Sequence, residues 1–138
     1  MASVVLDCSV TVAWFFEDEF TRYSERVRQT LLLEGAVAVS PAIWSAEVTN
    51  ALFQAERRKR IEPEKVTQAL GILARMPIDT DLLPIDSMLQ VLHLCRTHGL
   101  TAYDALYLEL ALRRNIPLAT QDTLLETSAK AAGAKVFD

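Results

Sequence analysis

The chain has 138 residues, enough for one domain with a sizeable core, and we treat residues 1–138 as a single domain. Its composition, 51% hydrophobic and 23% charged, is typical of a globular protein and argues against disorder. A net charge of -4 does not favour a nucleic-acid partner unless a local basic patch exists. No apolar run approaches the length of a membrane span and the N-terminus lacks the basic start of a signal peptide, so we expect a cytoplasmic protein.

The first predicted element is a strand over residues 3–6, because an unbroken β-favouring run is typical of a strand buried on both faces. Helices follow at 9–16 and 21–33, and a second buried strand at 36–39. Ser40-Pro41 predicts the start of a helix that runs to about Arg60, since a capping hydroxyl precedes a proline at the first helical position. The remaining predicted elements are a helix at 63–75, a strand at 81–85, a helix capped by Asp86 that ends near 98, a helix at 101–114, a strand at 116–119, a helix at 121–132 and a strand at 135–137. This alternation predicts an α/β fold in three layers with a parallel sheet.

Two acidic residues come directly after predicted strands. Asp7 follows the first strand and Asp122 follows the fourth. In open α/β sheets ligands bind outside the carboxyl ends of the strands, so both acids are placed where such a fold has its site. Each is equally well explained as a helix cap.

Two further acids lie on predicted helices. Glu47 borders the apolar stripe of the helix at 40–60 and lies beyond the first turn of that predicted helix, so neither capping nor the helix dipole accounts for it. Asp104 is three residues after Thr101, and the pair resembles part of a capping box. However, Asp104 shares its helix face with apolar residues, Tyr107 among them. A carboxylate on an apolar face needs a partner or a cation.

Four carboxylates in one place repel one another and remain ionised only beside positive charge. Ligands that are all oxygen atoms select a hard cation, Mg²⁺ or Mn²⁺, in preference to zinc. Such an ion supplies an activated water and neutralises charge on a phosphoryl oxygen. The set of acids therefore predicts a divalent metal site that acts on phosphate esters.

Four segments, VVLDCSV, SPAIWSAEVTNAL, TAYDALYLELA and LATQD, resemble in order and spacing the PIN-domain ribonucleases, most closely the VapC-type toxins of VapBC toxin–antitoxin systems. The resemblance covers essentially the whole chain. It implies a five-stranded parallel sheet of order 3-2-1-4-5. It also implies that the catalytic and metal-binding acids are Asp7, Glu47, Asp104 and Asp122, and that Ser9 and Thr120 position substrate or water.

The activity that the resemblance implies is Mg²⁺- or Mn²⁺-dependent hydrolysis of RNA phosphodiester bonds, leaving 5′-phosphate and 3′-hydroxyl ends. The implied partners are structured RNA, a second copy of the chain and a small VapB-like antitoxin that covers the site. Two other functions stay open from the residues alone: a phosphoryl-transfer domain, either a phosphatase or a receiver, and a binding module whose acids are helix caps.

An acidic site repels RNA, so some basic rim is needed. The candidate RNA-binding residues form the one basic run of the chain: Arg57, Arg58, Lys59 and Arg60. Cations at a helix C-terminus explain this run equally well, and the same ambiguity applies to Arg113-Arg114.

Overall fold

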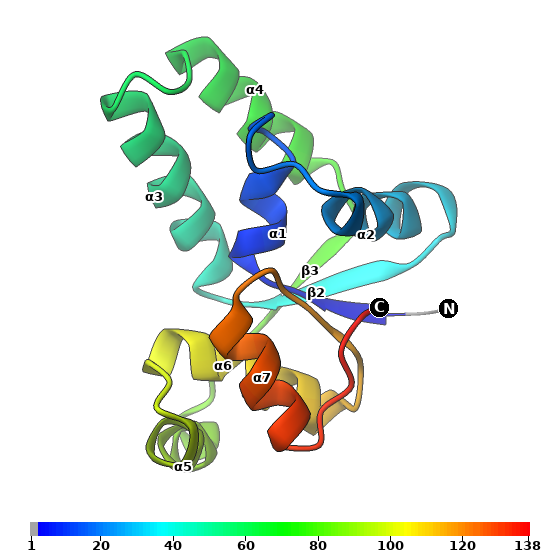
Figure 1. Cartoon of the computed structure of the whole chain (residues 1–138), viewed down its shortest axis with the longest axis vertical. Coiled ribbons are helices and arrows are strands. Elements are labelled where there is room, and N and C mark those ends of the chain that lie inside the picture. The colour runs from blue at the N-terminus through cyan, green and yellow to red at the C-terminus, as the bar shows by residue number, and fades with distance from the viewer. Residues whose placement is uncertain (1–2) are drawn as a thin grey trace.

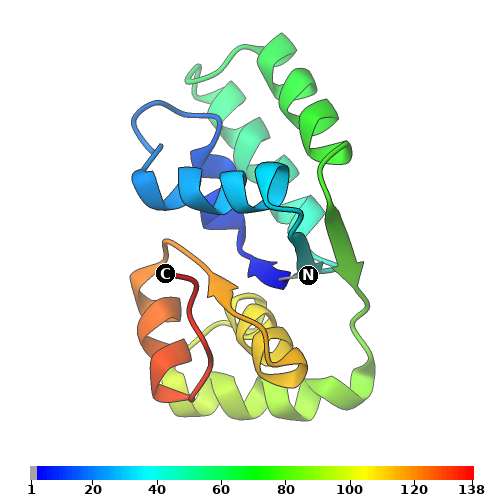
Figure 2. The same cartoon turned by 90° about the vertical axis from the view of Figure 1, so that its right-hand side faces the viewer.

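The computed structural model describes residues 3–138 and has a parallel sheet between two layers of helices. Figure 1 shows α1 to α4 on one side of the sheet and α5 to α7 on the other, and Figure 2 shows the same layers from a second direction. The three-layer α/β fold predicted from the sequence is confirmed.

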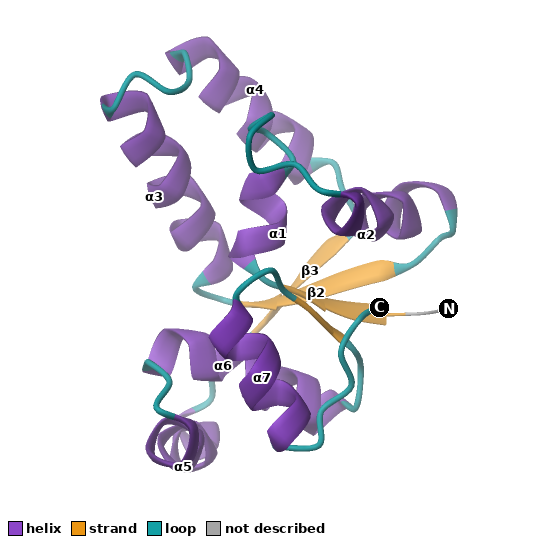
Figure 3. Cartoon of the chain, in the orientation of Figure 1, coloured by secondary structure: helices purple, strands orange, loops and turns teal. Residues whose placement is uncertain are grey.

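The strands are short and lie in the middle of the molecule, as the colouring of Figure 3 shows. They are β1 (Ser3–Leu6), β2 (Val37–Pro41), β3 (Ile78–Asp81) and β4 (Leu118–Ala119). Their order is β3-β2-β1-β4, with all pairs parallel. Val4, Val5 and Leu6 are at most 1% exposed, because helices cover both faces of β1.

The helices on the first side of the sheet are α1 (Cys8–Ala13), α2 (Arg22–Leu33), α3 (Trp44–Arg57) and α4 (Pro63–Ala74). On the other side a 3₁₀ turn η1 (Ile85–Ser87) precedes α5 (Met88–His98), α6 (Ala102–Arg114) and α7 (Thr123–Ala131). α6 packs against β1, β2 and β4, and its residues 105–111 are all buried. In the described part of the chain, no helix is both long and apolar enough to cross a bilayer.

The sheet has four strands where five were expected. The residues predicted as the fifth strand contribute one isolated parallel bridge, between Val136 and Leu118. Backbone hydrogen bonds of 2.9 Å join Leu118 to Lys135 and Phe137 on either side of that bridge. The chain end therefore lies beside β4, in the expected place, but β4 is only two residues long and offers little more to pair with.

The third strand lies earlier than predicted, at Ile78–Asp81 in place of 81–85. Leu82 is 79% exposed, and Pro84 has no N–H to donate to a sheet. The true strand is polar because it lies at the sheet edge, where only part of each face is covered. A search for unbroken runs of apolar residues therefore does not detect this strand.

Two predicted helix starts are also wrong. Ser40 and Pro41 belong to β2, and the Ser40 hydroxyl donates to the Leu6 carbonyl at 2.7 Å, so it caps no helix. α3 begins only at Trp44. Asp86 makes no capping hydrogen bond and lies in the 3₁₀ turn before α5.

Candidate active site

Four acidic residues come together from four separate segments. Asp7 follows β1, Glu47 and Asp104 lie in the first turns of α3 and α6, and Asp122 precedes α7. The pairing of Leu6 with Ala119 places the ends of β1 and β4 side by side, which brings Asp7 and Asp122 to one edge of the sheet. We call these four residues the acidic site.

Asp7 is the buried centre of the acidic site, with 5% of its surface exposed. Its Oδ2 accepts hydrogen bonds of 2.7 Å from the hydroxyls of Ser9 and Thr120. Within residues 3–138, Oδ1 accepts no hydrogen bond, and no buried side-chain oxygen there is left without a partner, so Oδ1 must reach the surface. Although Asp7 occupies the N-cap position of α1, its side chain makes no capping hydrogen bond. The cap interpretation of Asp7 is therefore wrong.

Ser9 and Thr120 join β1 to the loop after β4. The Ser9 hydroxyl accepts from the Gln121 N–H at 2.9 Å, and the Thr120 hydroxyl accepts from the Asp122 N–H at 3.0 Å. Each hydroxyl thus donates to Asp7 and accepts from a backbone N–H of the loop after β4. This arrangement fixes the Asp7 carboxylate relative to the loop that carries Asp122.

The loop after β4 is held from outside by α2, through contacts that the sequence did not predict. The Thr120 N–H donates to the Tyr23 hydroxyl at 3.3 Å, and the Thr21 hydroxyl donates to the side chain of Gln121. Tyr23 also packs edge-on against Phe137, with 6.0 Å between ring centroids. No local pattern relates residues about 100 positions apart, so nothing in the sequence marks these supports.

Glu47 extends from α3 toward α6, and its Oε1 accepts a hydrogen bond of 2.5 Å from the Tyr107 hydroxyl. Glu47 lies in the first turn of α3, because that helix starts later than predicted. The expectation that Glu47 lies beyond the reach of the helix dipole is therefore wrong. The carboxylate is nevertheless no cap: its hydrogen bond goes to another helix.

The other two acids, Asp122 and Asp104, differ in whether their carboxylates cap a helix. Asp122 caps α7, since its Oδ1 accepts from the Leu125 N–H at 3.0 Å, so its capping role is real. Asp104 contributes its backbone N–H to the cap formed by Thr101 at 3.2 Å, and its carboxylate accepts no hydrogen bond from the α6 backbone. The capping box suggested by the sequence is therefore only half formed.

Three carboxylates of the acidic site, Asp7, Glu47 and Asp104, have raised pKa values. Burial raises the pKa of Asp7 above its ordinary value, the Ser9 and Thr120 hydroxyls oppose that shift, and the charges of Asp104 and Asp122 add to it. Burial also raises the pKa of Glu47. The hydrogen bond from Tyr107 lowers it, and the charges of Asp7 and Asp104 raise it further. For Asp104, burial and then the charge of Asp122 raise the pKa. The site has concentrated negative charge.

No cation of the described chain neutralises this charge, since none of the ion pairs within residues 3–138 involves the four acids. Oxygen ligands of carboxylate and hydroxyl type fit Mg²⁺ or Mn²⁺, which bind through a few carboxylates and keep several waters. As the side chains stand within residues 3–138, no group of three or more His, Cys, Asp or Glu is placed so that it could hold a metal ion. The fit to a hard cation is therefore one of donor chemistry alone.

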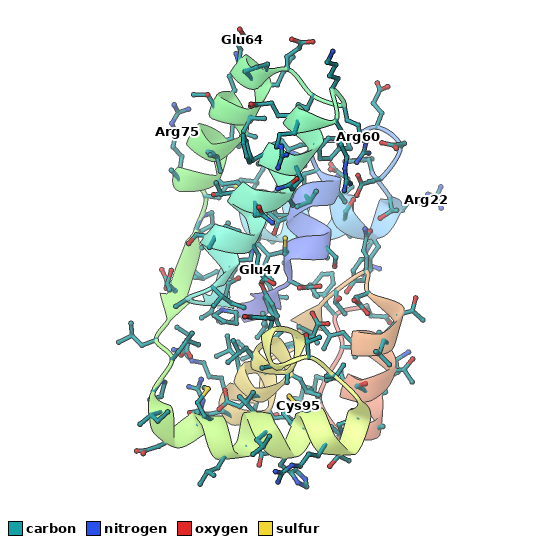
Figure 4. The ribbon with its side chains drawn as sticks, turned by 90° about the vertical axis from the view of Figure 1, so that its left-hand side faces the viewer. Arg22, Glu47, Arg60, Glu64, Arg75 and Cys95 are labelled. Atoms are coloured by element: carbon teal, nitrogen blue, oxygen red, sulfur yellow. The ribbon has the colours of Figure 1, made fainter. Side chains whose placement is uncertain are left out.

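Some of the basic residues singled out from the sequence are bound in ion pairs away from the acidic site. Arg60 bonds Asp18 and Glu19, at 3.2 and 2.9 Å, and lies 4.7 Å from the Phe16 ring centroid. Figure 4 shows Arg60 at the far end of α3 from Glu47. It thus ties the loop after α1 to the α3–α4 turn.

Arg113 and Arg114 both bond the carboxylate of Asp81, at 2.6 and 2.7 Å, and Arg113 also bonds Glu109 at 2.7 Å. Because Asp81 and Glu109 are each 5% exposed, these arginines neutralise buried charge. Arg113 and Arg114 thus have a structural role. Three members of the basic run, Arg57, Arg58 and Lys59, form no ion pair within residues 3–138 and are exposed.

The family model described as PIN domain matches residues 4–131. The chain belongs to the PIN-domain family. No curated protein matches it.

Solved structures resemble this PIN domain over most of its length. PAE2754 from Pyrobaculum aerophilum is 21% identical with a TM-score of 0.68, covering 98% of this chain and 83% of its own. VapC20 from Mycobacterium tuberculosis, a toxin that cleaves the sarcin–ricin loop, is 14% identical with a TM-score of 0.65, covering 95% of both chains. A chain of a toxin–antitoxin complex from Klebsiella pneumoniae is 17% identical with a TM-score of 0.60, covering 89% and 88%. At these identities the likeness shows the fold of this PIN domain, and its activity has to be argued from the acidic site.

Proposed function

We propose that this PIN domain is a Mg²⁺- or Mn²⁺-dependent endoribonuclease, the toxin of a type II toxin–antitoxin pair. The observation that carries the proposal is that four carboxylates from separate segments lie within reach of one another's charge, while no ion pair within residues 3–138 involves them. Membership of the PIN-domain family supports it, as does the likeness to a toxin that cleaves an RNA loop.

Asp7, Glu47, Asp104 and Asp122 would hold the cation. When bound, a divalent ion offers positive charge to phosphate oxygens and lowers the pKa of an attacking water. Ser9 and Thr120 keep the Asp7 carboxylate turned so that Oδ1 is available, because both donate to Oδ2. The acids thus create the negative site, and the neutral hydroxyls orient it without weakening its charge.

RNA is the proposed substrate, and the cytoplasm the proposed location. We further propose that the chain forms a homodimer and binds a small VapB-like antitoxin over the acidic site. An antitoxin that inserts an arginine among the four acids would replace the missing positive charge. The toxin–antitoxin complex from Klebsiella pneumoniae supports the choice of an antitoxin as partner.

The proposed RNA contacts are Arg57, Arg58 and Lys59, which form no ion pair within residues 3–138. They lie at the end of the α3–α4 hairpin, which extends away from the sheet in Figure 1. Arg60, the fourth residue of the predicted run, already bonds Asp18 and Glu19 and is not proposed as a contact.

The test is cleavage of a structured RNA by the purified chain with Mg²⁺ or Mn²⁺. We expect cutting that leaves 5′-phosphate ends, that EDTA abolishes, and that Asp7→Asn and Asp104→Asn each abolish while the circular dichroism spectrum stays that of the wild type. Asp79→Asn is the matched control, since Asp79 is an exposed carboxylate of β3 outside the acidic site. Cleavage that survives both EDTA and the two substitutions would overturn the proposal.

A further inference from the structure

Tyr107 is a fully buried tyrosine beside the acidic site. It is 0% exposed and lies three residues after Asp104 on α6, so both side chains project from neighbouring positions on one helix face. A buried phenol ordinarily needs a hydrogen-bond partner. The partner here is Glu47 of α3, which is labelled in Figure 4 and whose Oε1 accepts from the Tyr107 hydroxyl.

The Tyr107–Glu47 hydrogen bond is short and isolated. Its 2.5 Å between oxygens is at the short end of the range for a hydroxyl that donates to a charged carboxylate. Within residues 3–138 no other group donates to the Glu47 side chain, so Oε2 keeps its capacity to bind something else. Tyr107 therefore holds one oxygen of Glu47 and leaves the other available.

The choice of a phenol matters for the charge of the site. A lysine or arginine at the same place would fix Glu47 equally well, but it would also neutralise the charge that attracts a cation. The tyrosine hydroxyl is an uncharged group, and here it donates to Oε1 of Glu47. Tyr107 can thus orient the carboxylate while leaving the charge of the acidic site intact.

We propose that Tyr107 is a positioning residue for the metal site: it fixes Glu47 so that Oε2 is presented to the cation. This inference rests on the proposed function, because it assumes that Glu47 is a metal ligand. It adds a neutral donor from α6 that acts through Glu47 and touches neither the metal nor the RNA.

The test is the affinity of the full chain for Mn²⁺, measured by titration calorimetry after removal of metals with EDTA. Partners that orient metal ligands typically contribute 10- to 100-fold to metal affinity, so we expect Tyr107→Phe to weaken Mn²⁺ binding by at least about 10-fold. Tyr103→Phe is the matched control: Tyr103 lies on the same helix, is 63% exposed, and its loss should leave Mn²⁺ binding unchanged.

A double-mutant cycle separates positioning from a structural role. In a Glu47→Ala background Tyr107 has no carboxylate to orient, so adding Tyr107→Phe should weaken Mn²⁺ binding no further. A merely structural Tyr107 would lower the melting temperature and leave Mn²⁺ affinity unchanged. If the wild type binds Mn²⁺ and Tyr107→Phe binds it with an affinity within twofold of the wild type, this inference is overturned and the proposed function is not. A wild type that binds no Mn²⁺ overturns the proposed function and this inference with it.

A measurement on the wild type keeps the test decisive if Tyr107→Phe does not fold. The ring-carbon signals of tyrosine labelled with ¹³C at Cζ are followed by NMR during Mg²⁺ titration, and the Tyr23→Phe and Tyr103→Phe variants assign them. We expect the Tyr107 signal to move with saturation while that of exposed Tyr103 does not. A Tyr107 signal that stays fixed as Mg²⁺ saturates the chain refutes the role.

Discussion

Replacing Asp7 by asparagine removes one charge from the acidic site and keeps the shape of the side chain. The asparagine carbonyl can still accept from Ser9 and Thr120, so the main change is electrostatic. Two like charges within about 8 Å repel by about 2 kcal/mol at an effective dielectric near 20. Because Asp7 is 5% exposed and interacts with the other three carboxylates, we expect metal-free Asp7→Asn to be more stable by on the order of 1–2 kcal/mol. For a chain of this size that raises the melting temperature by about 4–8 °C.

The pH dependence of this difference follows from the direction of the pKa shift. Burial, opposed by two hydroxyls and assisted by the neighbouring acids, raises the folded-state pKa of Asp7 above its ordinary 3.8. Folding therefore favours the protonated form: its advantage is complete below pH 3.8 and is lost as the pH rises through the folded-state value. In EDTA, the stability gap between Asp7→Asn and wild type should widen as the pH rises through this window.

Divalent metal should make the wild type more stable than Asp7→Asn. A ligand that binds only the folded state stabilises it, by about 2.7 kcal/mol at 100 times its dissociation constant. Differential scanning calorimetry should therefore show Mg²⁺ raising the melting temperature of the wild type and leaving that of Asp7→Asn unchanged. Asp79→Asn controls for the change in net charge and should follow the wild type. If Asp7→Asn is less stable than wild type in EDTA, the Asp7 charge stabilises the fold and the reasoning fails.

Three further substitutions test other parts of the structure. Lys59 has φ of 60° after the end of α3, so Lys59→Gly should raise the free energy of unfolding in urea by about 1 kcal/mol. Asp81→Asn should lower it by about 2 kcal/mol at neutral pH, because Arg113 loses a charged partner. Burial opposes ionisation of Asp81, but its arginine hydrogen bonds prevail and lower its pKa, so this difference should shrink as the pH falls below 3.8. Thr120→Val removes one of the two donors to Asp7 and should weaken Mn²⁺ binding in calorimetry by about 10-fold.

The sequence predicts the fold best where burial is complete. Val4, Val5 and Leu6 form an unbroken apolar run because helices cover both faces of β1, and that run alone identifies the strand. β3 has no such apolar run, because a strand at the edge of the sheet needs few apolar residues. Ser40 misleads because its hydroxyl bonds the Leu6 carbonyl of a neighbouring strand, a contact that no helix-start pattern contains.

The sequence points to the four acids as a set, since each alone, after a strand or on a helix face, is a weak signal. It points to few of the groups that support them: Ser9 and Thr120 come from the resemblance to the family. Tyr107 stands out only as a neighbour of Asp104 on its helix face, and its bond to Glu47 joins residues 60 positions apart. Long-range pairing of this kind depends on how the layers pack, which one sequence without its fold does not reveal.

The placement of positive charge distinguishes this site from an ordinary ion-pair cluster. Buried carboxylates away from the site, Asp81 and Glu109, are bonded by arginine. The carboxylates of Asp7 and Glu47 are bonded only by hydroxyls within residues 3–138. A fold optimised for stability alone would neutralise both sets alike. The absence of arginine where the carboxylates are most concentrated is therefore what a site for an external cation requires, whether that cation is a metal ion or the arginine of an antitoxin.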